Sequence, residues 1–429
     1  MDLNNNKFNL AEQDLLESLL ESYYLDDDQL DYINKFYKEI FTINDNEKCL
    51  CNSKLTWEKC CKKKMDDNST EENYISFFQT INNPKLKSKY INQINKYNKL
   101  SIKAIKESPC FINNCQNKKT AMNLYSADEL MEIKNKNLKE DTNEAYLINV
   151  LDKKHIIKNI DTPFLNKENV NDNYKFYAVC KEHKKIFNNS KGKLNKNLIA
   201  LISKIYKYEI VNKCYQHQVV NFYKNLQVAE QVFLIIKWRM HNNVLIALYD
   251  DLQLMADNVD NENNNFVTKL FFLPNTNNFL LNDVILPPVT PITFRPINSI
   301  NNPFLKKKPL YIHTSKTQRD KEDKLLVTFT YRKEYKNLDL YFKEWISKFK
   351  NNKQIESWIS GIVISLSDQM LIQKQWFEKL KDSEIKIMNL HYYYRFEHPS
   401  GSQQELSIQT FYNNLHKSIN IFNKTLKIS

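Results

Sequence analysis

Residues 48–64 read KCLCNSKLTWEKCCKKK and hold four of the eight cysteines of the chain. Cys49 and Cys51 form one close pair, Cys60 and Cys61 form another, and eight residues separate the two pairs. Four soft thiolates at this spacing suit a tetrahedral structural zinc ion. Closely spaced cysteines with lysines beside them are typical of metal ligation in a reducing compartment, and less so of the disulfide framework of a secreted protein. We therefore expect these four cysteines, the first quartet, to bind zinc.

The first quartet, with its pattern C-x-C-x8-C-C, resembles the SEC-C motif, which is found at the C-terminus of the translocase ATPase SecA and in other proteins. The resemblance covers residues 48–63 and extends to Ser53 and Trp57. The chain departs from the family at Asn52 and Lys54, where glycine is usual. In that family the module is a docking element that engages the chaperone SecB. The resemblance therefore implies an interaction with a protein partner and no catalysis.

A second quartet combines Cys110-x4-Cys115 with Cys180-x2-His183. Three thiols and one imidazole in two close pairs are typical of a treble-clef or HNH-like zinc site. We expect Cys110, Cys115, Cys180 and His183 to bind a second zinc ion. The sequence thus predicts two structural zinc ions per chain.

Cys214-x2-His217 is a rival for the second pair of that site. It lies in a stretch with helical periodicity, where a spacing of three residues places both side chains on one face of the helix. We favour Cys180 and His183 as ligands and keep Cys214 and His217 as the alternative.

The sequence around the second quartet resembles a bacterial family without an assigned function. In that family a C…C pair precedes a Ser-His dipeptide, and a later C-x2-H leads into a phenylalanine. Residues 180–187 follow this pattern, and the likeness continues at residues 365–369 and 377–380. Where the relatives have Ser-His, this chain has Asn-Leu-Tyr-Ser at 123–126. A hydrolytic HNH site needs a histidine to activate water, and His155, which lysines flank, is expected to be a solvated residue.

The composition excludes several classes of protein. With 42% hydrophobic and 12% aromatic residues, the chain has enough apolar material for cores, and disorder throughout is not expected. Only three glycines occur, Gly192, Gly361 and Gly401. Phosphate-cradling loops need glycine where the backbone approaches the ligand, so Walker-type and Rossmann-type nucleotide sites are excluded. No signal-peptide pattern and no apolar run of bilayer length is present, so we expect a cytoplasmic protein with no membrane partner.

The net charge of +12 is unevenly distributed. Residues 1–47 hold twelve acidic and three basic side chains, a net charge of −9, so the rest of the chain carries +21. Two zinc-thiolate sites would leave a total of about +9. A basic body can bind a polyanion through phosphate contacts. A Lys- and Asn-rich composition without any such role explains the charge equally well.

Hydrophobic periodicity predicts an α+β fold that is mainly helical, with two small zinc-organised modules, a long helical spine and a small antiparallel sheet. The predicted segments are an acidic helical N-terminal segment (1–47), the SEC-C-like motif (48–64), a helical segment (65–105), a treble-clef-like module (106–190), a long helical region (191–258), a small β-sheet (259–335) and a C-terminal helical region (336–429).

Three further features of the sequence could bind a ligand or react, and each has a simpler explanation. Residues 391–398 interleave aromatic, basic and acidic groups, which suits stacking on single-stranded bases, although the alternation of a strand explains them equally well. Residues 313–315, near Lys316 and Arg319, could bind phosphate, but no glycine loop accompanies them and we expect a surface turn. Cys214, as a nucleophile, would need an activated thiol, which an apolar helix does not supply.

These features predict a zinc-binding protein that contacts another macromolecule, with nucleic acid as the first expectation. The resemblance to the bacterial family implies a role in stress or anti-phage defence, by analogy alone. One alternative is a SEC-C-type protein-docking adaptor associated with chaperones or translocation. Another is a metal-dependent, HNH-like nuclease with a degenerate site. A non-enzymatic role is favoured.

Overall fold

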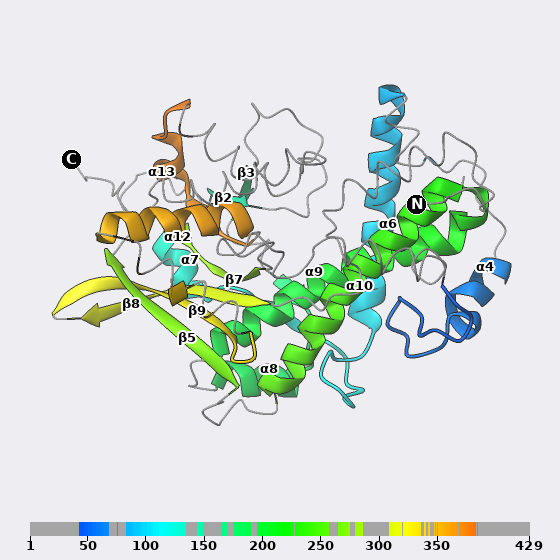
Figure 1. Ribbon diagram of the computed structural model, residues 1–429, viewed down its shortest axis with the longest axis horizontal. Helices are drawn as coiled ribbons and strands as arrows, with labels where there is room; N and C mark the ends of the chain where they lie inside the picture. The colour runs from blue at the N-terminus through cyan, green and yellow to red at the C-terminus, as the bar shows by residue number, and fades with distance from the viewer. Residues whose placement is uncertain are drawn as a thin grey trace. The chain divides into compact units, whose positions relative to one another are not determined.

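Figure 1 shows the structure, a computed structural model of the full chain. It describes residues 43–67, 75, 83–133, 144–148, 165–169, 175–189, 195–226, 228–256, 265–274, 279–285, 309–319, 321–335, 339, 342, 343, 347, 349, 351–367, 369–382 and 384. The chain divides into two compact units. Unit 1 comprises Met1–Ser108, Lys207–Ala247 and Asn298–Lys307, and unit 2 comprises Pro109–Tyr206, Leu248–Ile297 and Lys308–Ser429.

Several predicted features lie outside the described residues. They are residues 1–42 of the predicted acidic helical N-terminal segment, His155, and residues 391–398. Within the described part of the chain, the predicted α+β, mainly helical class is confirmed. None of the helices described there combines the length and the apolar character that crossing a lipid bilayer requires.

Unit 1 contains the helix α6 (Lys87–Glu107). Its buried side chains Ile94, Tyr97, Ser101 and Ile105 recur at intervals of three, four and four residues, so they line one face of the helix. The helix ends at Ser108, whose backbone is extended because Pro109 follows it.

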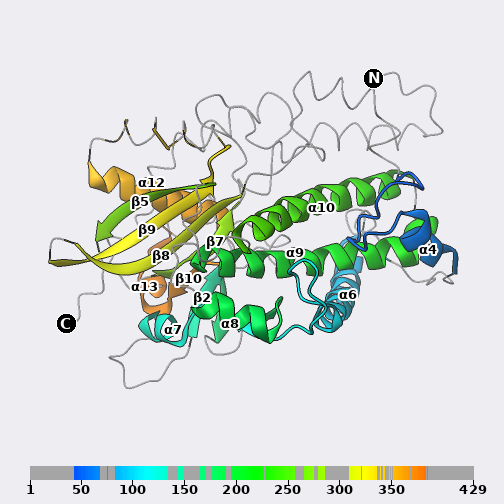
Figure 2. The same cartoon turned by 90° about the horizontal axis from the view of Figure 1, so that it is seen from below.

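The predicted long helical region consists of two helices, α9 (Asn195–Phe222) and α10 (Val228–Ala256), joined by the short 3-10 turn η4 (Tyr223–Asn225). Figure 2 shows α9 and α10 lying side by side. In unit 1 they are held together by polar contacts as well as by apolar packing. The Trp238 indole N–H donates to Asn212 Oδ1 at 2.6 Å, and the His241 ring stacks on Tyr208 with 4.5 Å between the ring centres. Both contacts fix the rotation of one helix against the other.

Unit 2 contains a four-stranded antiparallel sheet with the order β5-β9-β8-β7. Its strands are β5 (Phe266–Pro274), β7 (Asn282–Ile285), β8 (Leu310–Arg319) and β9 (Glu322–Arg332). The small antiparallel sheet predicted within 259–335 is therefore confirmed.

Residues 313–315 do not form the expected surface turn, because they lie inside β8. This strand has neighbours on both sides, with His313 opposite Asn282 of β7 and Thr328 of β9. The expectation was wrong because the polar side chains of this stretch concealed a strand, which pairs with β9 along its whole length and with β7 over Leu310–His313. His313 hydrogen-bonds Thr328 Oγ1 through Nδ1 at 2.6 Å instead of facing an anion.

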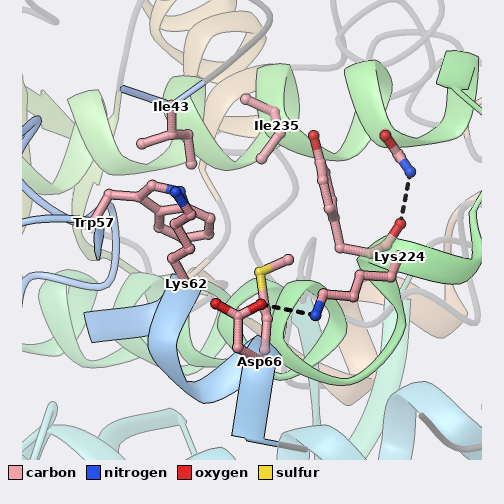
Figure 3. Close-up of a pocket in the computed structure, with 9 residues that line it drawn as sticks. Ile43, Trp57, Lys62, Asp66, Lys224 and Ile235 are labelled. Atoms are coloured by element: carbon pink, nitrogen blue, oxygen red, sulfur yellow. Dashed lines mark hydrogen bonds and ion pairs between the residues drawn. The ribbon is translucent and has the colours of Figure 1, made fainter. Parts of the chain in front are cut away.

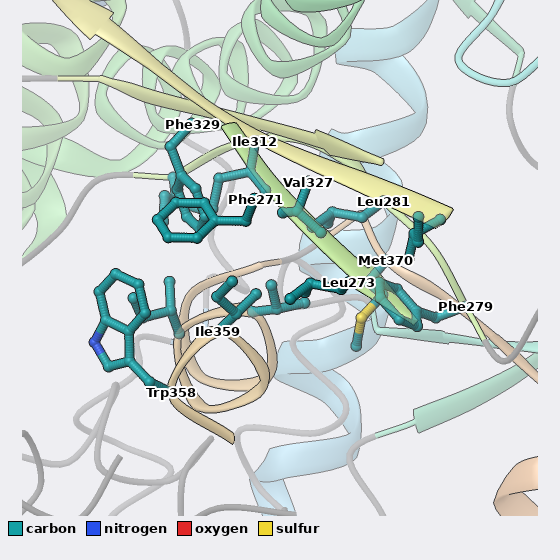
Figure 4. Close-up of a cluster of buried hydrophobic side chains, with 14 of the residues drawn as sticks. Phe271, Leu273, Phe279, Leu281, Ile312, Val327, Phe329, Trp358, Ile359 and Met370 are labelled. Atoms are coloured by element: carbon teal, nitrogen blue, oxygen red, sulfur yellow. The ribbon is translucent and has the colours of Figure 1, made fainter. Parts of the chain in front are cut away.

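The core of unit 2 lies between this sheet and the helix α12 (Asn352–Leu366), as Figure 4 shows. Trp358 of α12 is fully buried and meets Phe271 of β5 at 6.0 Å and Phe329 of β9 at 6.2 Å between ring centres. Rings at these separations add to the stabilisation that their buried area provides. Asn351 caps the helix by accepting a hydrogen bond from Gln354 N at 3.0 Å.

Unit 2 also contains a second sheet, with the order β3-β2-β10-β6, and a two-stranded ribbon of β1 (Ala121–Asn123) and β4 (Lys175–Tyr177). The second sheet joins β2 (Glu144–Ile148), β3 (Leu165–Asn169), β6 (Phe279–Leu280) and β10 (Leu371–Gln373). Short helices follow β1 and β10, namely α7 (Ala127–Ile133) and α13 (Lys374–Glu378). Residues predicted in three separate segments thus share one sheet.

A buried polar network in unit 2 centres on Asp283 of β7, which is 0% exposed. Its carboxylate accepts hydrogen bonds from Gln369 Nε2 at 2.7 Å and Ser367 Oγ at 2.8 Å, and it lies 3.3 Å from the Lys204 ammonium. Ser203 Oγ donates to Gln369 Oε1 at 2.8 Å. A charge buried this deeply is tolerated because it is paired and hydrogen-bonded.

Candidate metal centres

The first quartet sits on a tight loop followed by a helical turn. Lys48 and Thr56 pair as an antiparallel bridge, and Cys49 N donates to Leu55 O at 2.9 Å. After this loop the chain enters a turn of π-helix, η2 (Glu58–Lys62), in which Lys62 N donates to Trp57 O at 3.1 Å. Helix α4 (Lys63–Asp67) continues from it. The bridge brings the first cysteine pair back onto the pair that η2 carries.

The loop contains two residues in the left-handed region, Asn52 with φ 61° and Lys54 with φ 64°. These are the two positions where SEC-C motifs usually have glycine. The conformation that favours glycine is therefore kept without it. Asparagine tolerates this region well, whereas lysine has no such advantage and its Cβ makes the conformation costly by about 1 kcal/mol.

The four thiols of the first quartet converge to within 4.8 Å of one another, as the sequence predicts. Cys51 Sγ lies 3.4 Å from Cys60 Sγ, and Cys60 Sγ lies 3.9 Å from Cys61 Sγ. A tetrahedron with Zn–S bonds of ~2.3 Å has edges of about 3.8 Å. All four cysteines are buried, with exposed fractions from 0% to 4%. The donor set and its spacing therefore fit a metal ion.

The thiols of Cys51 and Cys61 differ in the direction in which their pKa is shifted. Hydrogen bonds from Cys49 and then Cys61 hold the pKa of the Cys51 thiol far below its usual range. Hydrogen bonds with Cys49 and then with Cys51 raise the pKa of the Cys61 thiol, and burial adds to the rise. The thiols of the quartet thus influence one another's protonation, and a metal cation would displace the protons that they hold.

Helix α10 anchors the first quartet within unit 1. The Arg239 guanidinium pairs with Glu47, two residues before Cys49, through both of its terminal nitrogens. Trp57 packs edge-on against Trp238, with 6.3 Å between ring centres. The quartet is therefore part of the core of unit 1 and not an isolated finger.

The second quartet is built from two segments of unit 2. The loop after Pro109 carries Cys110 and Cys115, and Cys180 and His183 lie at the start of α8 (Lys181–Asn189). Phe111 N donates to Ala178 O at 2.9 Å, which ties the first loop to the segment that enters α8.

The geometry of the second quartet also fits a metal ion. Its four ligand atoms lie within 4.8 Å of one another. His183 Nδ1 is 3.4 Å from both Cys110 Sγ and Cys180 Sγ, and Cys115 Sγ is 3.9 Å from Cys180 Sγ. Tetrahedral zinc with three sulfur ligands and one nitrogen has S–N edges of about 3.6 Å and S–S edges of about 3.8 Å.

The two quartets differ in exposure and in the source of their electrostatic support. Cys115 and His183 are partly exposed, whereas no member of the first quartet is. Burial raises the pKa of the Cys180 thiol, but hydrogen bonds with the backbone N–H groups of His183 and Glu182 and with the thiols of Cys115 and Cys110 together outweigh burial, so its pKa is lowered. Free N–H groups at the first turn of a helix stabilise a thiolate in this way.

The structure decides between the two pairs proposed for the second site. Cys180 and His183 join Cys110 and Cys115, whereas Cys214 lies in the core of unit 1 beside Ile94, Tyr97 and Phe222. His217 stacks on Tyr97, with 5.9 Å between ring centres. Cys214 and His217 belong to neither quartet.

Residues 123–126, which replace the Ser-His dipeptide, have a structural role. Ser126 and Glu129 form a reciprocal cap at the start of α7, with Ser126 N donating to Glu129 Oε2 at 2.8 Å and Glu129 N donating to Ser126 Oγ at 3.3 Å. Tyr125 is buried and its hydroxyl donates to Gln369 O at 2.5 Å. Among the described residues, the two quartets are the groups of Cys, His, Asp or Glu side chains that could hold a metal ion.

A pocket of about 460 Å³ opens beside the first quartet in unit 1 (Figure 3). Its walls come from Ile43, Trp57, η2 and α4 on one side, and from η4 and α10 on the other. The residues that line it are Ile43, Trp57, Lys62, Met65, Asp66, Tyr223, Lys224, Gln231 and Ile235. Most of this lining is apolar or aromatic, and it includes two lysines. Lys224 Nζ pairs with Asp66 at 2.8 Å and Lys62 Nζ pairs with Asp45 at 2.6 Å.

Sequence reasoning missed the residues from α9, η4 and α10 that surround the first quartet. They include Lys213 and Gln216, which contact the cysteines, and Tyr223 and Ile235 in the pocket. No local pattern in the sequence marks them. Comparison with protein-family models, curated proteins and solved structures gives no match to this chain.

Proposed function

We propose that this chain is a zinc-binding protein whose two metal centres hold the shape of a surface that contacts another macromolecule, with nucleic acid as the partner. The observation that carries the proposal is the convergence of two Cys/His quartets, each within 4.8 Å. Zinc accounts for both donor sets, because it accepts soft thiolates and imidazole in tetrahedral geometry without redox chemistry. Four protein ligands at each centre leave no coordination position for water, which is the arrangement of a structural site.

Charge supports nucleic acid as the partner. The chain carries +12 overall, and because its first 47 positions have a net charge of −9, the rest of the chain carries +21. The helical turn and helix beneath the first quartet add Lys59, Lys62, Lys63 and Lys64 within six residues. Clustered ammonium groups bind phosphates irrespective of base sequence. A role in bacterial stress or anti-phage defence stays a proposal by analogy with the family that the second quartet resembles.

Metal content tests the zinc centres directly. Elemental mass spectrometry of the purified full-length protein should give two zinc ions per chain. The double variant Cys60→Ser, Cys61→Ser should hold one, and Cys180→Ser should also hold one. The matched control is Cys214→Ser, which removes a buried cysteine outside both quartets and should keep two. A wild-type protein without zinc would refute the proposal.

Salt dependence tests the partner. The affinity for a fluorescent single-stranded or double-stranded oligonucleotide can be measured by anisotropy at several salt concentrations. The logarithm of the association constant should fall linearly with the logarithm of the salt concentration, with a slope of about −0.7 to −0.9 for each phosphate contacted. Replacing Lys59, Lys63 and Lys64 with glutamine should make that slope shallower. An affinity that does not respond to salt would point away from nucleic acid.

The pocket beside the first quartet favours a second candidate function, a SEC-C-type docking adaptor. A largely apolar lining that includes two lysines suits a polypeptide that inserts one apolar side chain between acidic residues. A library of random peptides should then yield binders of that pattern, and Tyr223→Ala should abolish their binding while the zinc content stays at two. Peptides that bind this variant as well as the wild type, or a selection without any such pattern, would rule the adaptor out.

A further inference from the structure

Three polar side chains of α9 point toward the first quartet from one face of the helix. They are Glu209, Lys213 and Gln216, which are spaced four and three residues apart and therefore lie above one another on the helix surface. Asn52 Nδ2 of the metal-binding loop lies 3.5 Å from Glu209 Oε1. This face of α9 therefore belongs to the surroundings of the first quartet, although it is remote in sequence.

Gln216 reaches a ligand atom. Its Nε2 donates to Cys61 Sγ at 3.3 Å, and 155 residues separate the two in the chain. Lys213 supports this contact in two ways. Its Nζ donates to Gln216 Oε1 at 3.3 Å and to the carbonyl oxygen of Cys51 at 3.4 Å. The three groups form a relay from ammonium through amide to thiol.

The chemistry of the relay fixes its direction. An ammonium group can only donate, so the side of the Gln216 amide that faces Lys213 must be its oxygen. The amide nitrogen then faces Cys61, and a metal-bound thiolate can only accept. The lysine therefore selects the amide orientation that suits a thiolate. It also brings one positive charge close to a centre in which four thiolates and one Zn²⁺ carry a net charge of −2.

We propose that Gln216, oriented by Lys213, is a positioning residue of the first metal centre, which holds the Cys61 thiolate in place and, with Lys213, offsets the excess negative charge of the zinc-thiolate group. This inference rests on the proposed zinc site. Residues that hydrogen-bond metal ligands contribute about 10- to 100-fold to metal affinity. The strength with which the chain retains its first zinc ion is therefore set in part by a helix that the SEC-C-like motif does not contain.

Two readouts test the relay in the full-length protein. The first is the rate of zinc release to an excess of 4-(2-pyridylazo)resorcinol, which should show two phases. The Cys60→Ser, Cys61→Ser variant identifies the phase of the first centre, because it lacks that phase. In Gln216→Ala this phase should accelerate about 10-fold, and in Gln216→Glu, which turns a second anion toward the thiolate, by about 10- to 100-fold. Lys213→Met should have a smaller effect in the same direction.

The second readout is the ¹¹³Cd NMR spectrum of the cadmium-substituted protein. Centres with four sulfur ligands and with three sulfur ligands and one nitrogen give separate resonances. Gln216→Ala should shift the resonance of the four-sulfur centre and leave the other unchanged. A residue that merely stabilises α9 would not change the electronic surroundings of one cadmium ion.

Gln218→Ala is the matched control, because Gln218 lies on the same helix and donates to the sulfur of Cys214, which is not a ligand, at 3.6 Å. It should leave both the release rate and the cadmium spectrum unchanged. If Gln216→Ala behaves like the wild type, or if both glutamine variants accelerate release equally, the relay is refuted. Either result would leave the proposed zinc centres intact as long as the wild type holds two metal ions. A wild type without metal would instead refute the proposed function.

Discussion

The buried ion pair of unit 2 gives the most demanding prediction. In Lys204→Met the ammonium that faces Asp283 at 3.3 Å is replaced by an uncharged side chain of similar length. Both side chains of the pair are almost fully buried, with exposed fractions of 1% and 0%. At this separation the attraction between unit charges is about 5 kcal/mol for an effective dielectric constant of about 20. The carboxylate would keep its hydrogen bonds from Ser367 and Gln369 and lose its paired cation.

We therefore expect Lys204→Met to lower the free energy of unfolding by about 3–5 kcal/mol, the range found when one partner of a buried pair is removed. In the double variant Lys204→Met, Asp283→Asn the stranded charge is gone, so about half of that loss should be recovered. Urea unfolding at fixed zinc concentration, followed by tryptophan fluorescence, measures both. Trp358 and Trp376 report from the core of the same unit.

The control is Lys224→Met, which removes the cation of the exposed pair with Asp66 and should leave the unfolding midpoint unchanged. The reasoning fails if Lys204→Met lowers the free energy of unfolding by less than about 1 kcal/mol, since a buried, unpaired carboxylate destabilises the folded state by more than that. It also fails if the double variant is no more stable than the single one.

Three further predictions follow from the same structure. Burial, and then the nearby Lys196, lower the pKa of His313 to about 4. Between about pH 6.5 and pH 4, His313 is therefore protonated in the unfolded chain and neutral in the folded chain. Stability should fall as the pH drops from 7.5 to 5, by about 2 kcal/mol more in the wild type than in His313→Gln; equal slopes in urea titrations would contradict this. Trp358→Ala should destabilise the protein by about 3–5 kcal/mol in the same assay, because it leaves a cavity beneath the sheet, and a loss under 1 kcal/mol would mean that α12 is not packed there. Lys54→Gly should raise stability or zinc affinity by about 1 kcal/mol, because φ 64° suits glycine, whereas a loss of either would show that the loop does not hold this conformation.

The residues of the two quartets were the most predictable part of the molecule, for a physical reason. A metal centre draws its ligands from short, closely spaced pairs, and the chemistry of sulfur and imidazole is visible in one-letter code. Both quartets assemble as predicted, and the structure prefers Cys180 and His183 over Cys214 and His217. The class of the fold was also predictable, since helical periodicity over 194–226 and strand-like runs after residue 266 are local properties.

The pairing of distant segments was not predictable in the same way. Strand β10 joins β2, which lies more than 200 residues earlier, and no periodicity in either segment encodes that choice of partner. Strand β8 was missed because a central strand needs only backbone pairing, and its polar residues concealed it. Gln216 was missed because a single glutamine on a helix carries no signal until the helix is placed beside the cysteines.

The separation of 155 residues between Cys61 and Gln216 also has a consequence in time. A ribosome adds about 5–20 residues per second, so the four thiols of the first quartet are exposed for about 8–30 s before the glutamine has been made. During that interval a nascent chain would hold any captured zinc by its cysteines alone. Exchange of the metal and oxidation of the thiols are then least hindered, and synthesis of α9 closes that period. Newly made protein should therefore be the population most sensitive to zinc starvation.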